Sequence, residues 1–218
     1  QQVYINGKKA KNPENIQFMY SVISPNATLN TKDFTKLAIS TEDRMQQSPS
    51  AYFLVLNNSQ KAKIKAMDPA IKIEKVDIGK LYGESGRLFP NDAAHFGNWT
   101  RDNFGPIYVP KAGAKVALND STIALYQRII QVYEGHDLKI DGSKIYIDGK
   151  LSTHYTIGQN YYWMMGDNRH NSEDSRFWGF VPETHVVGKP LFIWMSFLEG
   201  SPTKGIVWNR IFTRADTK

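Results

Sequence analysis

The sequence predicts a mainly antiparallel β fold with a small α+β unit inserted in its first half. The second half of the chain is a series of short aromatic and β-branched runs separated by Gly, Pro, Asn and Asp, which is the pattern of strands and turns. Two Asp-Gly pairs in that half are typical of tight hairpins. Residues from 12 to 80 instead mix helix-like and strand-like segments, which indicates a separate unit.

The hairpins are predicted from LKIDGSKIYIDGK at 138–150, where Asp141-Gly142 and Asp148-Gly149 bracket a short strand. Such pairs suit type I′ turns, because both central residues need a positive φ. VYINGKK at 3–9 nearly repeats IYIDGK at 145–150, so we expect a duplicated hairpin element. The strands expected in this half are 107–110, 123–133, 144–147, 161–165, 186–197 and 206–212.

The inserted unit is predicted from the alternation of two periods along the chain. Strands are expected at 16–23, 51–56 and 71–78, and helices at 31–40, 40–47 and 59–67. Thr31 and either Ser40 or Thr41 are the expected N-caps. This β-α-β-α-β order predicts an α+β subdomain. The expected division is residues 1–11 and 91–218 as an incomplete β-rich core, and 12–90 as the insertion.

The composition restricts the classes of partner and chemistry. The net charge is +6, with 27 Lys and Arg scattered along the chain, which favours a surface facing anionic lipid over a nucleic-acid groove. The absence of Cys excludes disulfides and thiol nucleophiles. The longest apolar run, 190–198, is about half of the roughly 20 residues that a membrane helix needs. Because the chain begins at Gln1 without Met, we expect it to be part of a longer protein, called the parent below.

The segment GDNRHNSEDSR at 166–176 concentrates hydrogen-bonding groups. A surface loop that satisfies its own polar groups is one interpretation. A metal site at Asp167, His170 and Asp174 is a second, and a paired-carboxylate hydrolase using Asp167 and Asp174 is a third. The chain has no G-x-S-x-G or S-x-x-K motif of a serine hydrolase. Spacing alone does not choose among these.

The longer run MMGDNRHNSEDSRFWGFVPETHVVGKPLFIWMSF at 164–197 resembles the most C-terminal signature of type I signal peptidases, the membrane-anchored Ser/Lys endopeptidases that remove signal peptides from exported proteins. His170 departs from the Asp commonly found at its position. The resemblance covers residues 105 to 212, whereas 12 to 90 resembles no element of the family.

The resemblance implies a β-rich catalytic fold and a set of supporting residues. Ser172 would hydrogen-bond the catalytic lysine, Gly166 would let that lysine approach closely, and Asp174 would pair with Arg176 to brace the loop. A lysine base must be neutral, so it needs apolar burial and a neighbour that orients it. No cofactor or metal is implied. The implied partners are signal peptides of exported preproteins and a membrane surface, at the outer face of the cytoplasmic membrane, and nucleic acid is not expected.

The nucleophile and base of that family are missing from the chain. The resemblance implies a nucleophilic serine in a Ser-Met context and a lysine base in a Lys-Arg-type strand. No Ser-Met dipeptide occurs in this chain, and Gln127 stands where the segment 125–150 would carry the lysine. An amide cannot act as a base. The echo at 3–9 favours a working lysine upstream of Gln1, with 125–150 as a later copy. The alternative is a non-catalytic module that binds a peptide or partner and has lost its base at Gln127.

The remaining polar and aromatic residues have structural interpretations. His95, His136, His154 and His185 lack the spacing of a triad or metal site, and we expect surface or hydrogen-bonded positions. One aromatic set is expected in the core, with part of it able to rest on lipid; its members are Tyr161, Tyr162, Trp163, Phe177, Trp178, Phe180, Phe192 and Trp194.

Overall fold

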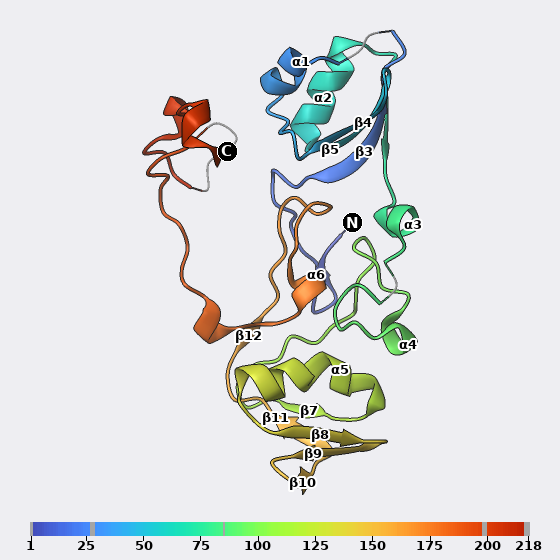
Figure 1. Cartoon of the computed structure of the whole chain (residues 1–218), viewed down its shortest axis with the longest axis vertical. Coiled ribbons are helices and arrows are strands. Elements are labelled where there is room, and N and C mark those ends of the chain that lie inside the picture. The colour runs from blue at the N-terminus through green and yellow to red at the C-terminus, as the bar shows by residue number, and fades with distance from the viewer. Residues whose placement is uncertain (1, 27–28, 85, 198–199, 216–218) are drawn as a thin grey trace.

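The computed structural model of the chain describes residues 2–26, 29–84, 86–197 and 200–215 (Figure 1). Every sheet is antiparallel and the helices are short, so the predicted mainly β fold is confirmed. The strands are β1 Tyr4–Ile5, β2 Lys8–Lys9, β3 Phe18–Ile23, β4 Arg44–Ser48, β5 Ala51–Leu56, β6 Lys72–Lys75, β7 Lys115–Ala117, β8 Leu138–Asp141, β9 Lys144–Ile147, β10 Lys150–Leu151, β11 His154–Thr156, β12 Tyr161–Tyr162 and β13 Val181–Pro182. The helices are α1 Thr31–Lys36, α2 Asn58–Met67, α3 Ile78–Tyr82, α4 Ala93–Phe96, α5 Asp120–Arg128 and α6 Ser175–Trp178.

The α+β unit, residues 16–78, is built on the four-stranded sheet β4-β5-β3-β6. Its chain order is β-α-β-β-α-β, the split βαβ arrangement, with one strand more than the sequence predicts. Helices α1 and α2 lie together beside the sheet at the top of Figure 1. Val22, Leu54, Leu56 and Ile64 are fully buried between these layers, so this unit has a hydrophobic core of its own.

The extra strand replaces an expected helix. Residues 40–47 were predicted to be helical, but Arg44–Ser48 form β4, in which Met45 pairs with Phe53 of β5. Pairing with a neighbouring strand overrides a weak local helix propensity. The expected N-cap Thr31 is also wrong by one residue, because the Asn30 side chain accepts hydrogen bonds from the backbone N–H groups of Lys32 and Asp33. Ser40 accepts from the N–H of Asp43 in a turn.

The β-rich part of the chain has a second core below the α+β unit in Figure 1. It joins α5 to the small sheets β10-β9-β8, β11-β7 and β12-β13. Ile129, Ile130 and Ile157 are almost fully buried there, and Phe180 stacks on Tyr126 with ring centroids 6.2 Å apart. This second core packs against the segment that follows β12, which carries the polar loop.

The hairpins form as predicted, with one change of turn. Asn6-Gly7 and Asp148-Gly149 both have two positive φ values, which is the expected type I′ geometry. The two hairpins therefore share one conformation, in line with the sequence echo. At the other pair, Asp141 of β8 lies opposite Lys144 of β9, so Gly142 and Ser143 form the loop. Of the Asp141-Gly142 pair, only Gly142 has a positive φ.

Several strands expected in this half do not form. Residues 123–133 are helical, as α5 followed by a π-helix at Ile129–Tyr133. The buried residues Ile123, Tyr126, Ile129 and Ile130 follow the helical period. Residues 107–110 are irregular, and the described parts of 186–197 and 206–212 contain only isolated bridges and a 3₁₀ turn.

The aromatic set is only partly buried. Tyr161 and Phe180 are in the core, whereas Trp178, Phe192 and Trp194 are exposed, Trp194 by 66%. In the described residues of the C-terminal segment, Trp208 and Phe212 are also exposed, by 75% and 68%. Within the described part of the chain, no helix is both long and apolar enough to cross a bilayer.

Candidate active-site loop

The polar loop is closed by a buried ion pair. Arg176 donates from Nε to Asp174 Oδ1 at 2.8 Å and from Nη2 to Asp174 Oδ2 at 2.7 Å. Asp174 is 4% exposed and Arg176 is fully buried. Burial by itself raises the pKa of Asp174, but the hydrogen bonds and charge of Arg176 outweigh it, so this pKa lies below its usual value. The pair is a bidentate one, which fixes orientation as well as charge.

Arg176 also connects segments that are distant in sequence. Its Nη2 donates to the backbone carbonyl of Arg169 at 2.7 Å, and its Nη1 donates to the carbonyl of Arg101 at 3.2 Å. Asp174 in turn is the N-cap of α6 and accepts from the N–H of Gly166 at 3.0 Å. The two ends of the loop are therefore held by one carboxylate and one guanidinium.

Gly166 and Ser172 lie against each other inside this brace. A Cβ atom placed on Gly166 would be 2.1 Å from Ser172 Oγ and 2.6 Å from Ser172 Cβ, so only glycine fits. Ser172 is partly exposed, and none of the hydrogen bonds found among the described residues involves its hydroxyl. The loop therefore presents a hydroxyl that is positioned and still available to a further group.

The structure brings together four of the five residues singled out from the sequence: Gly166, Ser172, Asp174 and Arg176. The fifth, Gln127, is exposed on α5, and no hydrogen bond of the loop in the described chain comes from that helix. Its neighbour Tyr126 faces the core instead. The predicted roles of all five residues stay predictions.

The loop also contacts the α+β unit, which the sequence did not indicate. Gln17 donates its N–H to the carbonyl of Asp167 at 2.8 Å and accepts from the N–H of Arg169 at 3.0 Å. Asp43 accepts from the side-chain amide of Asn168 at 2.8 Å. The contact between Asp43 and Asn168 joins residues 125 positions apart, and no local pattern reveals such a pairing.

His170 lies at the centre of this contact. Its Nδ1 accepts from the backbone N–H of Met19 at 2.9 Å, and its Nε2 is 3.0 Å from Asp102 Oδ1. Burial raises the pKa of Asp102, but the hydrogen bonds from His170 and Lys75 lower it far more, to well below its usual value. With both His170 nitrogens bound and Asp174 paired to Arg176, the arrangement does not match the metal site at Asp167, His170 and Asp174.

Arg169 is buried next to the brace without matching partners. It is 4% exposed, and its Nε and Nη1 atoms have no acceptor among the described residues. Burial and the nearby charge of Arg176 lower its pKa. Buried N–H groups without acceptors are costly, and the negative charges of Asp167 and Asp174 act in the opposite direction by raising the pKa of Arg169.

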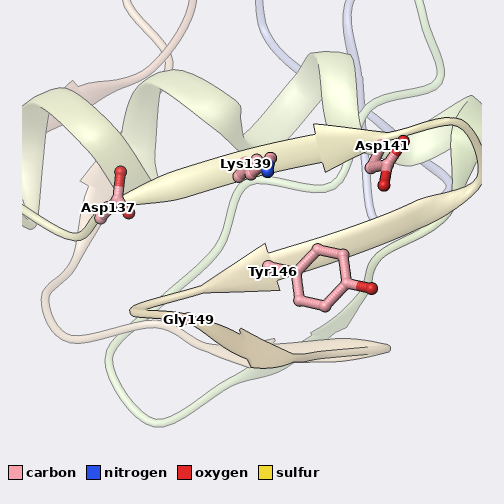
Figure 2. Close-up of a pocket in the computed structure, with 5 residues that line it drawn as sticks. All are labelled: Asp137, Lys139, Asp141, Tyr146 and Gly149. Carbon is pink, nitrogen blue, oxygen red and sulfur yellow. The ribbon is translucent and has the colours of Figure 1, made fainter.

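A second group of charged residues lies on the β8-β9 sheet. A pocket of about 280 Å³ is lined by Asp137, Lys139, Asp141, Tyr146 and Gly149. Figure 2 shows Lys139 between the two carboxylates along β8, with the Tyr146 ring on the neighbouring strand. The three charged residues are exposed, and the lining contains no Ser or Thr. This pocket therefore has the character of a solvated surface.

The remaining histidines occupy the kinds of position that the sequence predicts. His95 Nδ1 is 2.7 Å from Asp92, and His136 Nδ1 is 2.7 Å from Asp148. His154 and His185 are exposed and neighbour Thr hydroxyls. The described residues contain no cluster of three or more His, Asp or Glu side chains that could hold a metal ion.

Comparison with known proteins identifies the part of the chain that carries the loop. The family described as signal peptidase, peptidase S26, matches residues 109–195. This part of the chain is therefore similar to signal peptidases. The match includes Gly166, Ser172, Asp174 and Arg176, and it leaves the α+β unit outside.

Curated relatives named signal peptidase I agree with the family. The chain is 44% identical to the protein of Haemophilus influenzae over 69 residues, which are 30% of this chain and 20% of that protein. It is 29% identical to the protein of Helicobacter pylori strain 26695 over 138 residues, which are 55% of this chain and 47% of that protein. In both cases the match spans less than half of the relative's length. No solved structure matches the chain.

Proposed function

We propose that the chain is part of a signal peptidase I, a serine endopeptidase that removes signal peptides from exported preproteins at the outer face of the cytoplasmic membrane. The observation that carries the proposal is the Ser172 hydroxyl, which is held against Gly166 by the Asp174–Arg176 brace and has no hydrogen-bond partner in the described chain. A hydroxyl in that state suits the orientation of a neutral lysine.

In the proposed reaction the nucleophilic serine and the lysine base come from upstream of Gln1. The lysine Nζ takes the serine proton, the serine oxygen bonds to the scissile carbonyl carbon, and the peptide C–N bond breaks as the proton passes to the leaving amine. Water then attacks the acyl carbon while the same lysine accepts its proton, and the ester C–O bond breaks as that proton passes to the serine oxygen, which restores the serine and releases the acid product. Ser172 accepts or donates one hydrogen bond at Nζ and restricts its rotation.

The division of the chain supports this assignment. The α+β unit has its own core and lies outside the family match, in line with an insertion at 12–90 in a β-rich catalytic core made of 1–11, 91–218 and upstream residues. The exposed Phe192, Trp194 and Trp208 suit a membrane surface, where Trp and Phe side chains bind favourably. Gln127 is on the exposed side of α5, away from the loop that carries Ser172, which favours a copied segment over a base that was lost.

Cleavage of a preprotein by the purified parent tests the proposal. We expect Ser172→Ala to lower kcat on the order of 10- to 100-fold, because the lysine loses its orientation, while Ser172→Thr, which keeps the hydroxyl, retains more activity. Ser143→Ala, at an exposed hairpin position, is the matched control. Cleavage by the 218-residue chain alone that survives Ser172→Ala would contradict the proposal. A parent without Ser-Met and Lys-Arg upstream would favour the non-catalytic module.

A further inference from the structure

We infer that the α+β unit positions Ser172, by holding residues 167–171 through Gln17, Met19 and Asp43. The inference rests on the proposed function, in which Ser172 orients the catalytic lysine. It assigns the α+β unit the role of holding Ser172 in place. Residues 167–171 come directly before Ser172, so a displacement of this segment moves the Ser172 hydroxyl. The α+β unit thus supplies positioning residues to a site to which it contributes no reacting group.

The backbone of Gln17 binds the backbone of the loop directly. The N–H of Gln17 donates to the carbonyl of Asp167, and the carbonyl of Gln17 accepts from the N–H of Arg169. Together these two bonds form a parallel β-bridge between Gln17 and Asn168. Gln17 comes immediately before β3. Backbone bonds on both sides of one residue fix its register along the partner strand. The loop is in effect docked onto the beginning of the α+β sheet.

His170 extends the contact by its side chain, which is completely buried. Since the Met19 N–H donates to Nδ1, that nitrogen carries no hydrogen, and the hydrogen of the neutral imidazole is on Nε2, where it donates to Asp102. The ring also lies edge-on to Phe18 with centroids 5.4 Å apart. Met19 and Phe18 are both in β3, so His170 is held by the same strand from two directions.

The acceptor Asp102 is itself anchored to the α+β sheet. Lys75 of β6 donates to Asp102 Oδ1 at 3.1 Å, and β6 pairs directly with β3. Arg101, next in sequence to Asp102, donates to the backbone carbonyl of His170 at 2.9 Å. The ring of His170 therefore depends on a carboxylate held by this sheet, and its backbone carbonyl depends on the residue next to that carboxylate.

Asp43 makes the third contact, on the other side of the loop. Its Oδ1 accepts from the side-chain amides of Asn168 at 2.8 Å and Asn171 at 3.4 Å. Ser40 donates to the second oxygen of Asp43 at 2.8 Å and holds it in place. Asn171 is the residue before Ser172, so this contact ends next to the hydroxyl that has to be positioned.

A double-mutant cycle in the parent tests the inference, with preprotein cleavage as the readout. We expect His170→Ala to lower kcat about 10-fold, with KM unchanged, because the Ser172 hydroxyl is displaced. In a Ser172→Ala background the same substitution should have no further effect, since the group through which it acts is gone. His170→Asn should recover part of the activity, because its Oδ1 can accept from the Met19 N–H. His136→Ala, at a partly exposed ion pair next to the β8-β9 sheet, is the matched control.

Asp43→Ala is the second variant, and it carries the test if His170→Ala does not fold. We expect a smaller fall in kcat that again disappears in the Ser172→Ala background, whereas Glu42→Ala, at the exposed neighbouring position, should match wild type. Two-bond ¹H–¹⁵N NMR of the parent should show the Nε2–H tautomer for His170. The Nδ1–H tautomer would overturn the bond with Met19 and the inference with it.

The outcomes separate the two proposals. If Ser172→Ala leaves cleavage unchanged, the proposed function fails, and the inference fails with it. If Ser172→Ala lowers kcat but the folded His170→Ala and Asp43→Ala variants cleave like wild type, the inference alone fails. The inference also fails if His170→Ala or Asp43→Ala lowers kcat by the same factor with and without Ser172→Ala, because the contacts then act independently of Ser172.

Discussion

The loop at 166–176 and the β8 surface both gather Asp with Arg or Lys, but their charges are in opposite surroundings. In the loop, Asp174 and Arg176 are removed from water and bound to each other. On β8, Asp137, Lys139 and Asp141 are exposed beside a pocket (Figure 2). A buried charge depends on its partner, whereas an exposed charge has water as a partner. Burial of a charged group, rather than the presence of a pocket, therefore distinguishes the candidate loop from the β8 surface.

The largest effect is expected for Arg176→Ala, which would leave Asp174 buried without its partner. The free energy of unfolding should fall by about 3 to 5 kcal/mol, measured by chemical denaturation. The control Arg128→Ala removes an exposed guanidinium from α5 and should cost less than about 1 kcal/mol. Equal losses for the two variants would remove the distinction between buried and solvated charges.

Gly166→Ala should have the next largest effect. Its Cβ would overlap with Ser172, so we expect a loss of about 1 to 3 kcal/mol in unfolding free energy together with a fall in preprotein cleavage by the parent. The double variant Gly166→Ala/Ser172→Gly should regain the stability but not the activity.

Gly158→Ala is the matched control for this close approach. Its Cβ would be 2.9 Å from Glu134 Oε2, away from the loop, so it should lower stability and leave cleavage at the wild-type rate. A wild-type cleavage rate for Gly166→Ala, or a lowered one for Gly158→Ala, would contradict the assignment of the loop.

Acid should weaken the loop in a direction set by Asp174. Its pKa in the folded chain is below the ordinary value of 3.8, so its stabilising contribution is present above that value and is lost as the pH falls through the lower folded pKa. The free energy of unfolding should therefore decrease more steeply below about pH 4 in wild type than in Asp174→Asn, measured by denaturation at pH 7, 5, 4 and 3. Parallel curves would show that the buried pair does not titrate as proposed.

Asp141→Asn should have the smallest effect, because it alters a carboxylate that water already solvates. We expect a change in unfolding free energy within about 0.5 kcal/mol and no change in cleavage by the parent. A marked loss of cleavage would mean that the β8 pocket takes part in the reaction, and it would reverse the comparison.

The sequence predicts those parts of the fold and the candidate site that depend on contacts between residues close in sequence. The type I′ turns at Asn6-Gly7 and Asp148-Gly149 follow from the residues themselves, and Asp174 and Arg176 pair across two positions. The segment 40–47 was misassigned because pairing with β5 decides its structure. Residues 123–133 were misassigned because their β-branched composition was weighted above the helical spacing of Ile123, Tyr126 and Ile130.

The contacts of the candidate loop with the α+β unit were not predictable in the same way. Gln17, Met19 and Asp43 belong to ordinary strand and turn segments, and nothing in their neighbourhoods distinguishes them from similar residues. The sequence marks His170 as a departure from the family pattern and as one possible metal ligand, whereas the structure places it at the buried centre of the contact. Only the folded chain brings these groups together.

The bond between Met19 and His170 joins residues 151 positions apart, and this separation has a consequence for the order of folding. Closing so long a loop has an entropic cost that local hairpins and helices avoid. The α+β unit and the hairpins can form early from nearby residues, whereas the Ser172 loop must wait until both flanks are in place. We therefore expect its amides to be among the last protected during refolding and among the first to exchange with solvent in the native protein.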